Sequence, residues 1–270
     1  MDRRGVSGRI VGRAGRLVAA VGLALWLGAG AYGASTPEKP PDRKPDKKKW
    51  SPPRVKARQA ERDAMVRTIR VHGVEDKAAL KAMAAVPRHE FVPKNLSRVA
   101  YADSPLPIGY GQTISQPCVV AEMTAHLKLA PTSKVLEVGT GSGYQAAVLT
   151  EFTEHVYSVE IIKALADAAQ KRFRRLGYST VRVRNADGYH GWKDEGPFDA
   201  IIVTCAAGRI PPPLIRQLKP GGRMILPVGA PFAVQSLILI TKSKEGKLRG
   251  RSLKPVRFVP LVRKKDESAK

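Results

Sequence analysis

The fold of this chain is decided by the stretch EVGTGSG, residues Glu137–Gly143. It follows the short apolar run 135–138, and the spacing of apolar residues after it predicts a helix as far as about Phe152. Glycines between a strand and a helix let the backbone approach a ligand closely and adopt positive φ. Because open α/β sheets bind nucleotides at the carboxyl end of the first strand, the stretch predicts a ligand site there.

The spacing of the glycines and the acid before them indicate which ligand this site takes. Dinucleotide-binding folds show GxGxxG and hold a pyrophosphate on the helix N-terminus, whereas this chain has GxGxG with Glu137 two positions ahead. A carboxylate in that position would repel a pyrophosphate, but it can organise a ligand that carries an ammonium group. S-adenosylmethionine carries an ammonium and a sulfonium cation, and we therefore predict it as the cofactor.

Two further acids stand at the ends of the next predicted strands. Glu160 is placed to accept hydrogen bonds from two ribose hydroxyls, as acids do at this point in nucleotide-binding folds. Asp187 precedes Gly188 where an adenine amino group would fall. Each acid alone could be an ordinary turn residue, but three at successive strand ends favour a cofactor site. The cofactor-binding residues predicted here are Glu137, Gly139, Gly141, Gly143, Glu160, Asp187 and Gly188.

The body of the chain alternates between strand and helix patterns. This alternation predicts an α/β fold with a doubly wound, mostly parallel sheet, preceded by a small N-terminal helical extension. The long segment 87–117 is punctuated by proline and glycine, and such loops inside a compact domain are usually functional. The expected helices are 57–71, 77–86, 119–127, 163–176 and 213–218; the expected strands are 135–138, 155–161, 181–186, 200–203, 224–228, 237–241 and 256–262, the last two paired with each other.

The first 54 residues have a different composition from the rest. An arginine-rich start, an apolar run from Leu17 to about Ala31 and small residues after it are typical of a secretory signal peptide over 1–34. The run could also serve as an uncleaved anchor, or the start codon could be mis-assigned. Residues 35–54 are rich in proline and lysine, which predicts a disordered linker. The folded domain is therefore expected over 55–265.

The formal net charge of +24 suggests an anionic partner. Much of this charge lies in the N-terminal region, for example at Lys47, Lys48 and Lys49, and the remainder is scattered. A polar tail and solvated faces explain most of it, so nucleic acid is not the expected partner. An anionic surface could still be contacted through the basic N-terminal region.

Beyond the glycine stretch, several segments resemble the protein-L-isoaspartate(D-aspartate) O-methyltransferase family over roughly residues 57–262. The segment most specific to that family is Thr113-Ile114-Ser115 together with Pro117. The glycine stretch alone would indicate only the wider methyltransferase class. The matching segments are AAVPRHEFVP (84–93), LPIG (106–109), GQTISQP (111–117), 135–144, PFDAIIVT (197–204), LKPGG (218–222), ILPVG (225–229) and VRFVPLV (256–262).

The resemblance implies a fold of the class I S-adenosylmethionine-dependent methyltransferase type and an enzyme that methylates damaged proteins. Such enzymes transfer the methyl group to the α-carboxylate of L-isoaspartyl residues, and the ester collapses to a succinimide that can reopen to aspartate. Ser115 falls on the position assigned as active site, and Thr113 and Ile114 would line the cleft for cofactor and substrate. The family is ordinarily cytoplasmic, whereas the leader predicts an exported, periplasmic or membrane-tethered protein.

The chemistry of this reaction agrees with the residues present. A carboxylate acceptor has a pKa of about 4, so it is already ionised at neutral pH and needs no general base. Ser115 is then interpreted as a hydroxyl that orients the acceptor carboxylate. His89 and His126 are interpreted as structural residues and not as bases, and Cys118 is interpreted as a packing residue. The sequence contains no CxxC motif, no HExxH motif and no histidine cluster, so it predicts no metal site.

Two other functions remain open from the sequence. The first is a methyltransferase of the same fold that acts on another acceptor, such as nucleic acid, through the basic surface. The second is a non-catalytic binding protein that keeps the cofactor fold and works through its basic tail.

Overall fold

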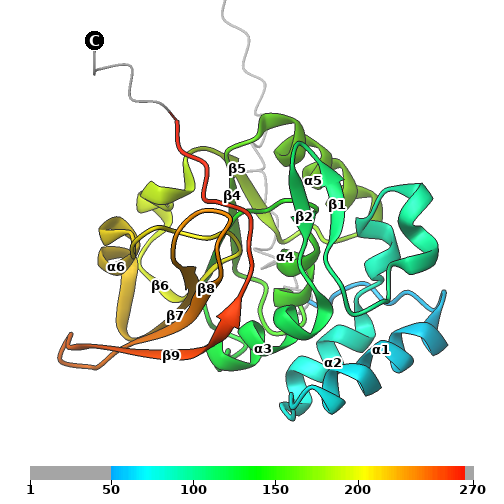
Figure 1. The fold of residues 1–270 in the computed structure, drawn as a ribbon, viewed down its shortest axis with the longest axis horizontal. Helices are drawn as coiled ribbons and strands as arrows, with labels where there is room; N and C mark the ends of the chain where they lie inside the picture. The colour runs from blue at the N-terminus through cyan, green and yellow to red at the C-terminus, as the bar shows by residue number, and fades with distance from the viewer. Residues whose placement is uncertain (1–49, 265–270) are drawn as a thin grey trace, which may run out of the picture. The chain divides into compact units, whose positions relative to one another are not determined.

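The computed structural model describes residues 50–264, so the predicted leader and most of the predicted linker lie outside the described residues. The described chain folds around a seven-stranded sheet with the order β5-β4-β3-β6-β7-β8-β9 (Figure 1). In chain order its strands are β3 (Val135–Val138), β4 (Val156–Glu160), β5 (Arg182–Asn185), β6 (Phe198–Val203), β7 (Leu218–Val228), β8 (Gln235–Lys242) and β9 (Leu248–Val256).

Five of these strands run parallel, and this arrangement creates the site. β5, β4, β3, β6 and β7 pair in parallel, while β8 and β9 extend the sheet as an antiparallel hairpin. From β3 the chain winds outward to β4 and β5, and then returns to the other side of β3 as β6. The strand order therefore reverses between β3 and β6, which is where doubly wound sheets bind ligands.

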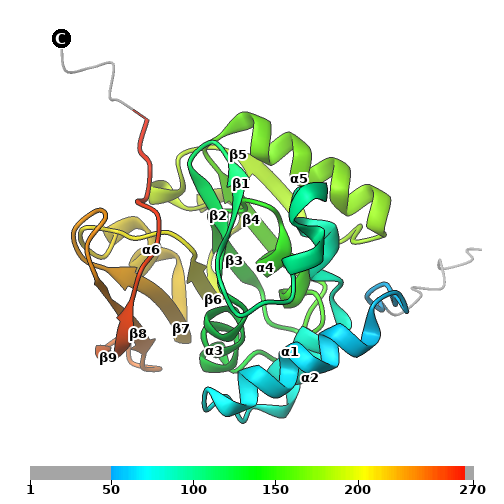
Figure 2. The same ribbon diagram turned by 45° about the vertical axis from the view of Figure 1, so that its right-hand side comes forward.

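Side chains alternate between the two faces of the sheet, and each face has its own core. Val135 belongs to a core shared with helices α1 to α5, whereas Leu136 and Val138 belong to a core shared with α6. This alternation is the period of two that a strand covered on both faces requires. Figure 2 shows α1 and α2 side by side next to α3. The helices are α1 (Gln59–Val71), α2 (Lys77–Ala85), α3 (Pro117–Leu127), α4 (Tyr144–Leu149), α5 (Lys163–Leu176) and α6 (Pro212–Gln217).

The segment 87–117 has more regular structure than the proline and glycine pattern predicted. It contains two 3₁₀ helices, η1 (Arg88–Phe91) and η2 (Lys94–Val99), followed by the hairpin of β1 (Leu106–Gly109) and β2 (Gln112–Ile114). Three successive residues from Gly109 to Gly111 have positive φ, which makes the turn tight. The hairpin delivers Thr113–Ser115 to the start of α3.

The predicted strand at 256–262 is wrong. The structure pairs β8 with β9, which ends at Val256, and residues 257–264 form no regular strand. β9 is a mostly exposed edge strand that contains three basic residues, a glycine and a proline, so its sequence lacks the apolar alternation of a buried strand. The apolar residues after it instead cross the carboxyl ends of the strands, where they line a pocket.

The N-terminal boundary of the domain also differs from the prediction. The linker was expected to reach residue 54, but Trp50 Nε1 donates a hydrogen bond to the carbonyl of Thr150 at 3.4 Å and Arg54 pairs with Glu151. Residues 50–54 therefore already contact the domain. In the described part of the chain, no helix is long and apolar enough to cross a membrane.

Candidate active site

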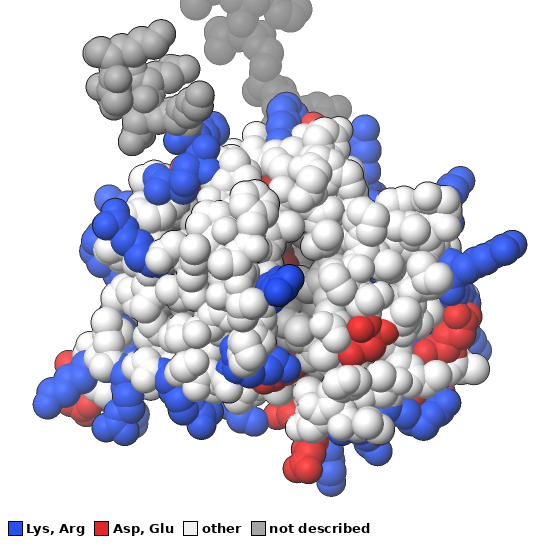
Figure 3. Space-filling model, in the orientation of Figure 1, with Lys and Arg blue, Asp and Glu red and all other residues white. Residues whose placement is uncertain are grey.

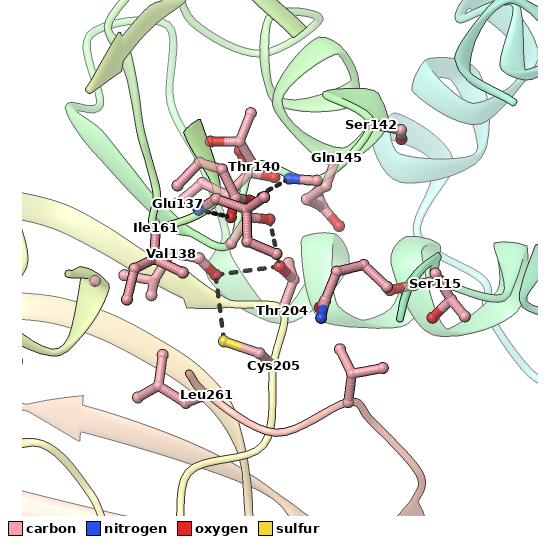
Figure 4. A pocket seen from close by; sticks show the side chains of 18 of the residues that line it. Ser115, Glu137, Val138, Thr140, Ser142, Gln145, Ile161, Thr204, Cys205 and Leu261 are labelled. Carbon is pink, nitrogen blue, oxygen red and sulfur yellow. Dashed lines mark hydrogen bonds between the residues drawn. The ribbon is translucent and has the colours of Figure 1, made fainter. Parts of the chain in front are cut away.

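A pocket of about 720 Å³ opens at the carboxyl ends of β3, β4 and β6 (Figure 4). Segments far apart in the sequence meet in it, because the strand order reverses at this point. The predicted residues that line it are Thr113, Ile114, Ser115, Glu137, Gly139, Gly141, Glu160 and Gly188, whereas Gly143 and Asp187 are not among the lining residues.

The glycines of the loop are required for two different reasons. Gly139 has a φ of +97°, and a Cβ there would stand 2.6 Å from Thr204 Oγ1. That hydroxyl donates a hydrogen bond to the Gly139 carbonyl at 2.7 Å, so β6 holds the loop close. Gly143 also has positive φ, but a Cβ there would meet the Phe173 ring at 2.6 Å. Gly143 therefore serves the packing of the loop against α5, which differs from the predicted cofactor contact.

Glu160 is held rigidly at the end of β4. Its two carboxylate oxygens accept hydrogen bonds from the backbone N–H groups of Gly141 at 2.8 Å and Ile162 at 2.9 Å. The side chain is buried yet lines the pocket. Because each carboxylate oxygen has a second lone pair, Glu160 can still accept hydrogen bonds from ligand hydroxyls. The site thus presents an acceptor whose position is fixed before a ligand arrives.

Glu137 is a fully buried carboxyl group with one oxygen left without a partner. Ser158 donates a hydrogen bond to Oε2, and Thr140 in turn lies 2.5 Å from the Ser158 hydroxyl. Within residues 50–264, Oε1 has no hydrogen-bond partner. Burial raises the pKa of Glu137 to about 8. An ammonium group in the pocket would satisfy the orphaned oxygen and favour the ionised form, so the residues present fit the predicted cofactor.

Asp187, just after the end of β5, is bound by the C-terminal segment of the described chain. Its carboxylate accepts hydrogen bonds from Arg263 Nε at 2.9 Å and from the backbone N–H groups of Tyr189 and Lys264 at 3.0 and 3.2 Å. Burial alone would raise its pKa, but these donors hold the pKa of Asp187 below its ordinary value. The Arg263 guanidinium also stacks on the Tyr189 ring, 3.7 Å from the centroid. Asp187 therefore fastens the C-terminal segment over the pocket.

A second cavity of about 1190 Å³ adjoins the pocket, and both are lined by Thr113 and Ser115. Figure 3, in the orientation of Figure 1, shows a hollow near the centre of the molecule with a basic side chain at its border. The cavity is lined by Lys254 and Arg257 from the end of β9 onward. Lys254 pairs with Glu122, whereas Arg257 makes no ion pair or hydrogen bond within the described residues. Arg257 therefore brings a positive charge to the cavity that no acid between residues 50 and 264 pairs with.

The described residues offer no evident general base beside Ser115. His89 and His126 line neither cavity, and burial lowers the pKa of both imidazoles. Cys118 lines the second cavity, but burial raises the pKa of its thiol to about 12, which keeps it protonated at neutral pH. Between residues 50 and 264, no group of three or more His, Cys, Asp or Glu side chains could hold a metal ion.

Several lining residues were not predicted from the sequence. The largest missed group is the segment 259–262, whose apolar residues were assigned to a strand. Its only distinguishing signal was its place in the matching segment VRFVPLV. Others come from the ends of strands and the start of α4, where single polar residues give no periodic signal. They include Thr140, Ser142, Tyr144, Gln145, Thr204 and Cys205.

Comparisons with known proteins agree with this geometry. The family model for protein-L-isoaspartate(D-aspartate) O-methyltransferase matches residues 60–266. A Protein-L-isoaspartate O-methyltransferase 2 from Syntrophobacter fumaroxidans is 63% identical over 187 residues, which cover 69% of this chain and 76% of that protein. A Protein-L-isoaspartate O-methyltransferase from Gloeobacter violaceus is 53% identical over 199 residues, covering 74% of this chain and 97% of that protein.

A solved structure from Plasmodium falciparum extends the comparison to three dimensions. It is described as a protein-L-isoaspartate O-methyltransferase in complex with S-adenosyl-L-homocysteine. It matches 74% of this chain and 98% of that chain, with 25% sequence identity and a TM-score of 0.65.

The parallel sheet with its glycine loop, Glu137 and Glu160 defines a class I S-adenosylmethionine-dependent methyltransferase, which confirms the predicted fold and cofactor. Within that class, the chain belongs to the protein-L-isoaspartate(D-aspartate) O-methyltransferase family.

Proposed function

We propose that this enzyme transfers the methyl group of S-adenosylmethionine to the α-carboxylate of L-isoaspartyl residues in damaged proteins, which starts their conversion back to aspartate. One observation carries the proposal: Thr113 and Ser115 line both the cofactor pocket and the adjoining cavity, which also bears the cation Arg257. A cofactor in the pocket and an anionic acceptor in the cavity would therefore meet at Ser115.

The residues of the chain supply position and charge in this reaction. When bound, S-adenosylmethionine supplies an electrophilic methyl group, and Glu137 and Glu160 would hold its ammonium and ribose groups. Ser115 would donate a hydrogen bond to the acceptor carboxylate and orient one oxygen toward the methyl carbon. Because that carboxylate is ionised at neutral pH, no side chain needs to remove a proton. Positioning of this kind can supply much of a rate enhancement.

The experiment that tests this function uses two synthetic peptides that differ only in having isoaspartate or normal aspartate at one position. The protein and methyl-labelled S-adenosylmethionine are incubated with each peptide, and label released by mild base is counted. We expect a base-labile methyl ester on the isoaspartyl peptide alone. Equal transfer to both peptides, or transfer to nucleic acid with neither peptide methylated, would contradict the proposal.

We also propose that residues 1–34 direct the protein out of the cytosol, as a cleaved leader or a membrane tether. The arginine-rich start and the apolar run from Leu17 support this proposal. The test is fractionation of bacterial cells that express the full chain or a Leu23→Arg/Leu25→Arg variant, whose apolar run is broken. We expect the unaltered chain in the periplasmic or membrane fraction and the variant in the cytosol. Cytosolic location of both would contradict the proposal.

The basic residues around Lys47–Lys49 are proposed to contact an anionic surface. Lysines near a membrane contribute about 1 kcal/mol each to binding of anionic lipid. We expect the full chain to sediment with vesicles containing phosphatidylglycerol and not with purely zwitterionic vesicles. Replacement of the three lysines by glutamine should reduce that binding, and an unchanged bound fraction would assign the contact to other residues.

A further inference from the structure

Arg88 lies at the start of η1, and its guanidinium reaches into the segment that contains Ser115. The side chain is fully buried. Its Nη2 donates a hydrogen bond to the Ser115 carbonyl at 2.7 Å, and its Nε donates one to the Ala100 carbonyl at 2.8 Å. A longer contact of 3.4 Å joins Nη2 to the Ser104 carbonyl. One side chain thus ties three separate backbone positions together, and one of them is Ser115.

This arrangement is energetically costly. Within residues 50–264, Arg88 forms no ion pair, and its Nη1 has no hydrogen-bond partner. The guanidinium carbon lies 4.8 Å from the centre of the Tyr144 ring. Burial lowers the pKa of Arg88 to about 10, so the group remains charged at neutral pH. Burial of a cation that has no ion-pair partner is unfavourable, and an apolar side chain of similar volume would fill the space without that penalty.

The chain beyond Ser115 is held from another side by Asp103. One carboxylate oxygen accepts a hydrogen bond from the Cys118 backbone N–H at 2.8 Å, at the start of α3. The other accepts one from Gln116 Nε2 at 2.9 Å. Ser115 is thus fixed through its carbonyl by Arg88 and through the following residues by Asp103. The Ser115 hydroxyl makes no hydrogen bond within the described residues, and it lines both cavities.

We propose that Arg88 is a positioning residue for methyl transfer, because it fixes the carbonyl of Ser115 and thereby the direction in which the Ser115 hydroxyl meets the acceptor carboxylate. The proposal rests on the function proposed above for Ser115. In-line displacement is sensitive to such placement, since an error of about 1 Å in the geometry can lower a rate about 100-fold.

Arg62 offers a matched control elsewhere in the same domain. It is also fully buried, and its guanidinium also binds backbone carbonyls, including that of Ala84 at 2.7 Å. Its other partners are the carbonyls of Ala57 and Val55 and the Gln59 side chain. None of these residues lines either cavity. Loss of Arg62 should therefore destabilise the domain as loss of Arg88 does, without moving Ser115.

The experiment compares the Arg88→Met, Arg88→Lys and Arg62→Met variants of the full chain. For each, the Tm, the Kd of S-adenosylhomocysteine, and the kcat and KM for an isoaspartyl peptide are measured per folded molecule. We expect Arg88→Met to lower kcat about 10- to 100-fold while the Kd changes by less than about twofold. Arg62→Met should lower the Tm but leave kcat within about twofold of wild type. Arg88→Lys keeps the charge and should regain part of the lost kcat.

Two results would overturn the proposal. In the first, Arg88→Met keeps a kcat close to that of wild type; if this variant does not fold, an unreduced kcat in Arg88→Lys has the same meaning. In the second, Arg62→Met lowers kcat as much as Arg88→Met does, and the loss of kcat would then be explained by general destabilisation of the domain. A wild-type protein that binds S-adenosylhomocysteine yet leaves the isoaspartyl peptide unmethylated would instead refute the proposed function, and the role of Arg88 with it.

Discussion

The two sides of the active site are built in different ways. The cofactor side consists of the loop Glu137–Gly143 and Glu160, which stand at the ends of buried parallel strands. The acceptor side consists of Arg257, from the segment after the edge strand β9, and of Thr113–Ser115, which come from a short hairpin and also border the cofactor pocket. Glu137 and Glu160 are buried, whereas Arg257 is exposed and Ser115 is partly so.

This difference suggests that one side of the site binds the cofactor and the other positions the acceptor carboxylate. On the cofactor side, the sheet itself fixes each group, because its backbone hydrogen bonds leave little freedom at the strand ends. On the acceptor side, single side chains such as Arg88 and Asp103 hold an otherwise irregular segment. We therefore expect substitutions on the cofactor side to change affinity for the cofactor, and those on the acceptor side to change turnover or affinity for the peptide.

The largest effect is expected for Glu160→Ala. This change removes the acceptor for two backbone N–H groups and for the ribose hydroxyls that Glu160 is proposed to bind. Hydrogen bonds to charged groups contribute about 1.5–3 kcal/mol each, so the affinity for S-adenosylhomocysteine should fall at least about 100-fold. Calorimetric titration measures this affinity. Glu154→Ala, an exposed change in the loop before β4, is the control, and comparable affinity in the two variants would remove Glu160 from the cofactor side.

Ser115→Ala is expected to have the next largest effect, on turnover alone. Loss of an oriented hydroxyl should lower kcat about 10- to 100-fold and leave the Kd of S-adenosylhomocysteine within about twofold of wild type. Steady-state kinetics with an isoaspartyl peptide measures kcat, and exposed Ser252→Ala provides the comparison. Unchanged turnover would show that Ser115 does not act on the acceptor.

Glu137→Gln should lower the affinity for S-adenosylhomocysteine about tenfold, because the neutral amide attracts an ammonium group less strongly than a carboxylate does. It should also change the dependence of stability on pH. The folded-state pKa of about 8 exceeds the ordinary value of 4.5. The stability that this group contributes is therefore complete below about pH 4.5 and is lost as pH rises through about 8, at about 1.4 kcal/mol per unit of pKa shift.

Urea unfolding of the ligand-free protein at several pH values measures this dependence. The free energy of unfolding of wild type, relative to that of Glu137→Gln, should decline between pH 5 and pH 8. Exposed Glu75→Gln should leave the wild-type dependence in place. A parallel pH dependence in wild type and Glu137→Gln would contradict the raised pKa.

The smallest effect is expected for Arg257→Gln. Removal of an exposed cation from the acceptor cavity should raise KM for the isoaspartyl peptide about threefold and leave kcat and cofactor affinity unchanged. The difference should shrink at high salt, because exposed charges are screened. Arg249→Gln on β9 lies outside both cavities and is the control. An equal rise in KM in both variants would indicate a general effect of surface charge.

The same contrast explains how much could be predicted from the sequence. The cofactor side was predictable because its residues follow apolar strands at fixed intervals, and the structure brings Glu137 and Glu160 into one pocket. Asp187 stands at the predicted strand end, and its carboxylate accepts a hydrogen bond from Arg263, 76 residues away. No pattern near Asp187 in the sequence could reveal that partner.

On the acceptor side, the prediction of Ser115 depends on resemblance to a family, since spacing alone leaves a turn residue before Pro117 as an equal alternative. The sequence predicts a strand over 256–262 because apolar residues that line a pocket and apolar residues of a strand look alike in sequence. The contact between Arg88 and Ser115 could not be predicted, because Arg88 binds backbone carbonyls. Every residue carries a backbone carbonyl, so the sequence does not indicate which ones a side chain will reach.

The most direct test of this separation is the Kd of S-adenosylhomocysteine for a Ser115→Ala/Arg257→Gln double variant, in which both residues proposed to contact the acceptor are altered. We predict that this Kd lies within about twofold of the wild-type value although methyl transfer to the isoaspartyl peptide is largely lost. A Kd raised tenfold or more would contradict the account, because it would show that the two sides of the site are not independent.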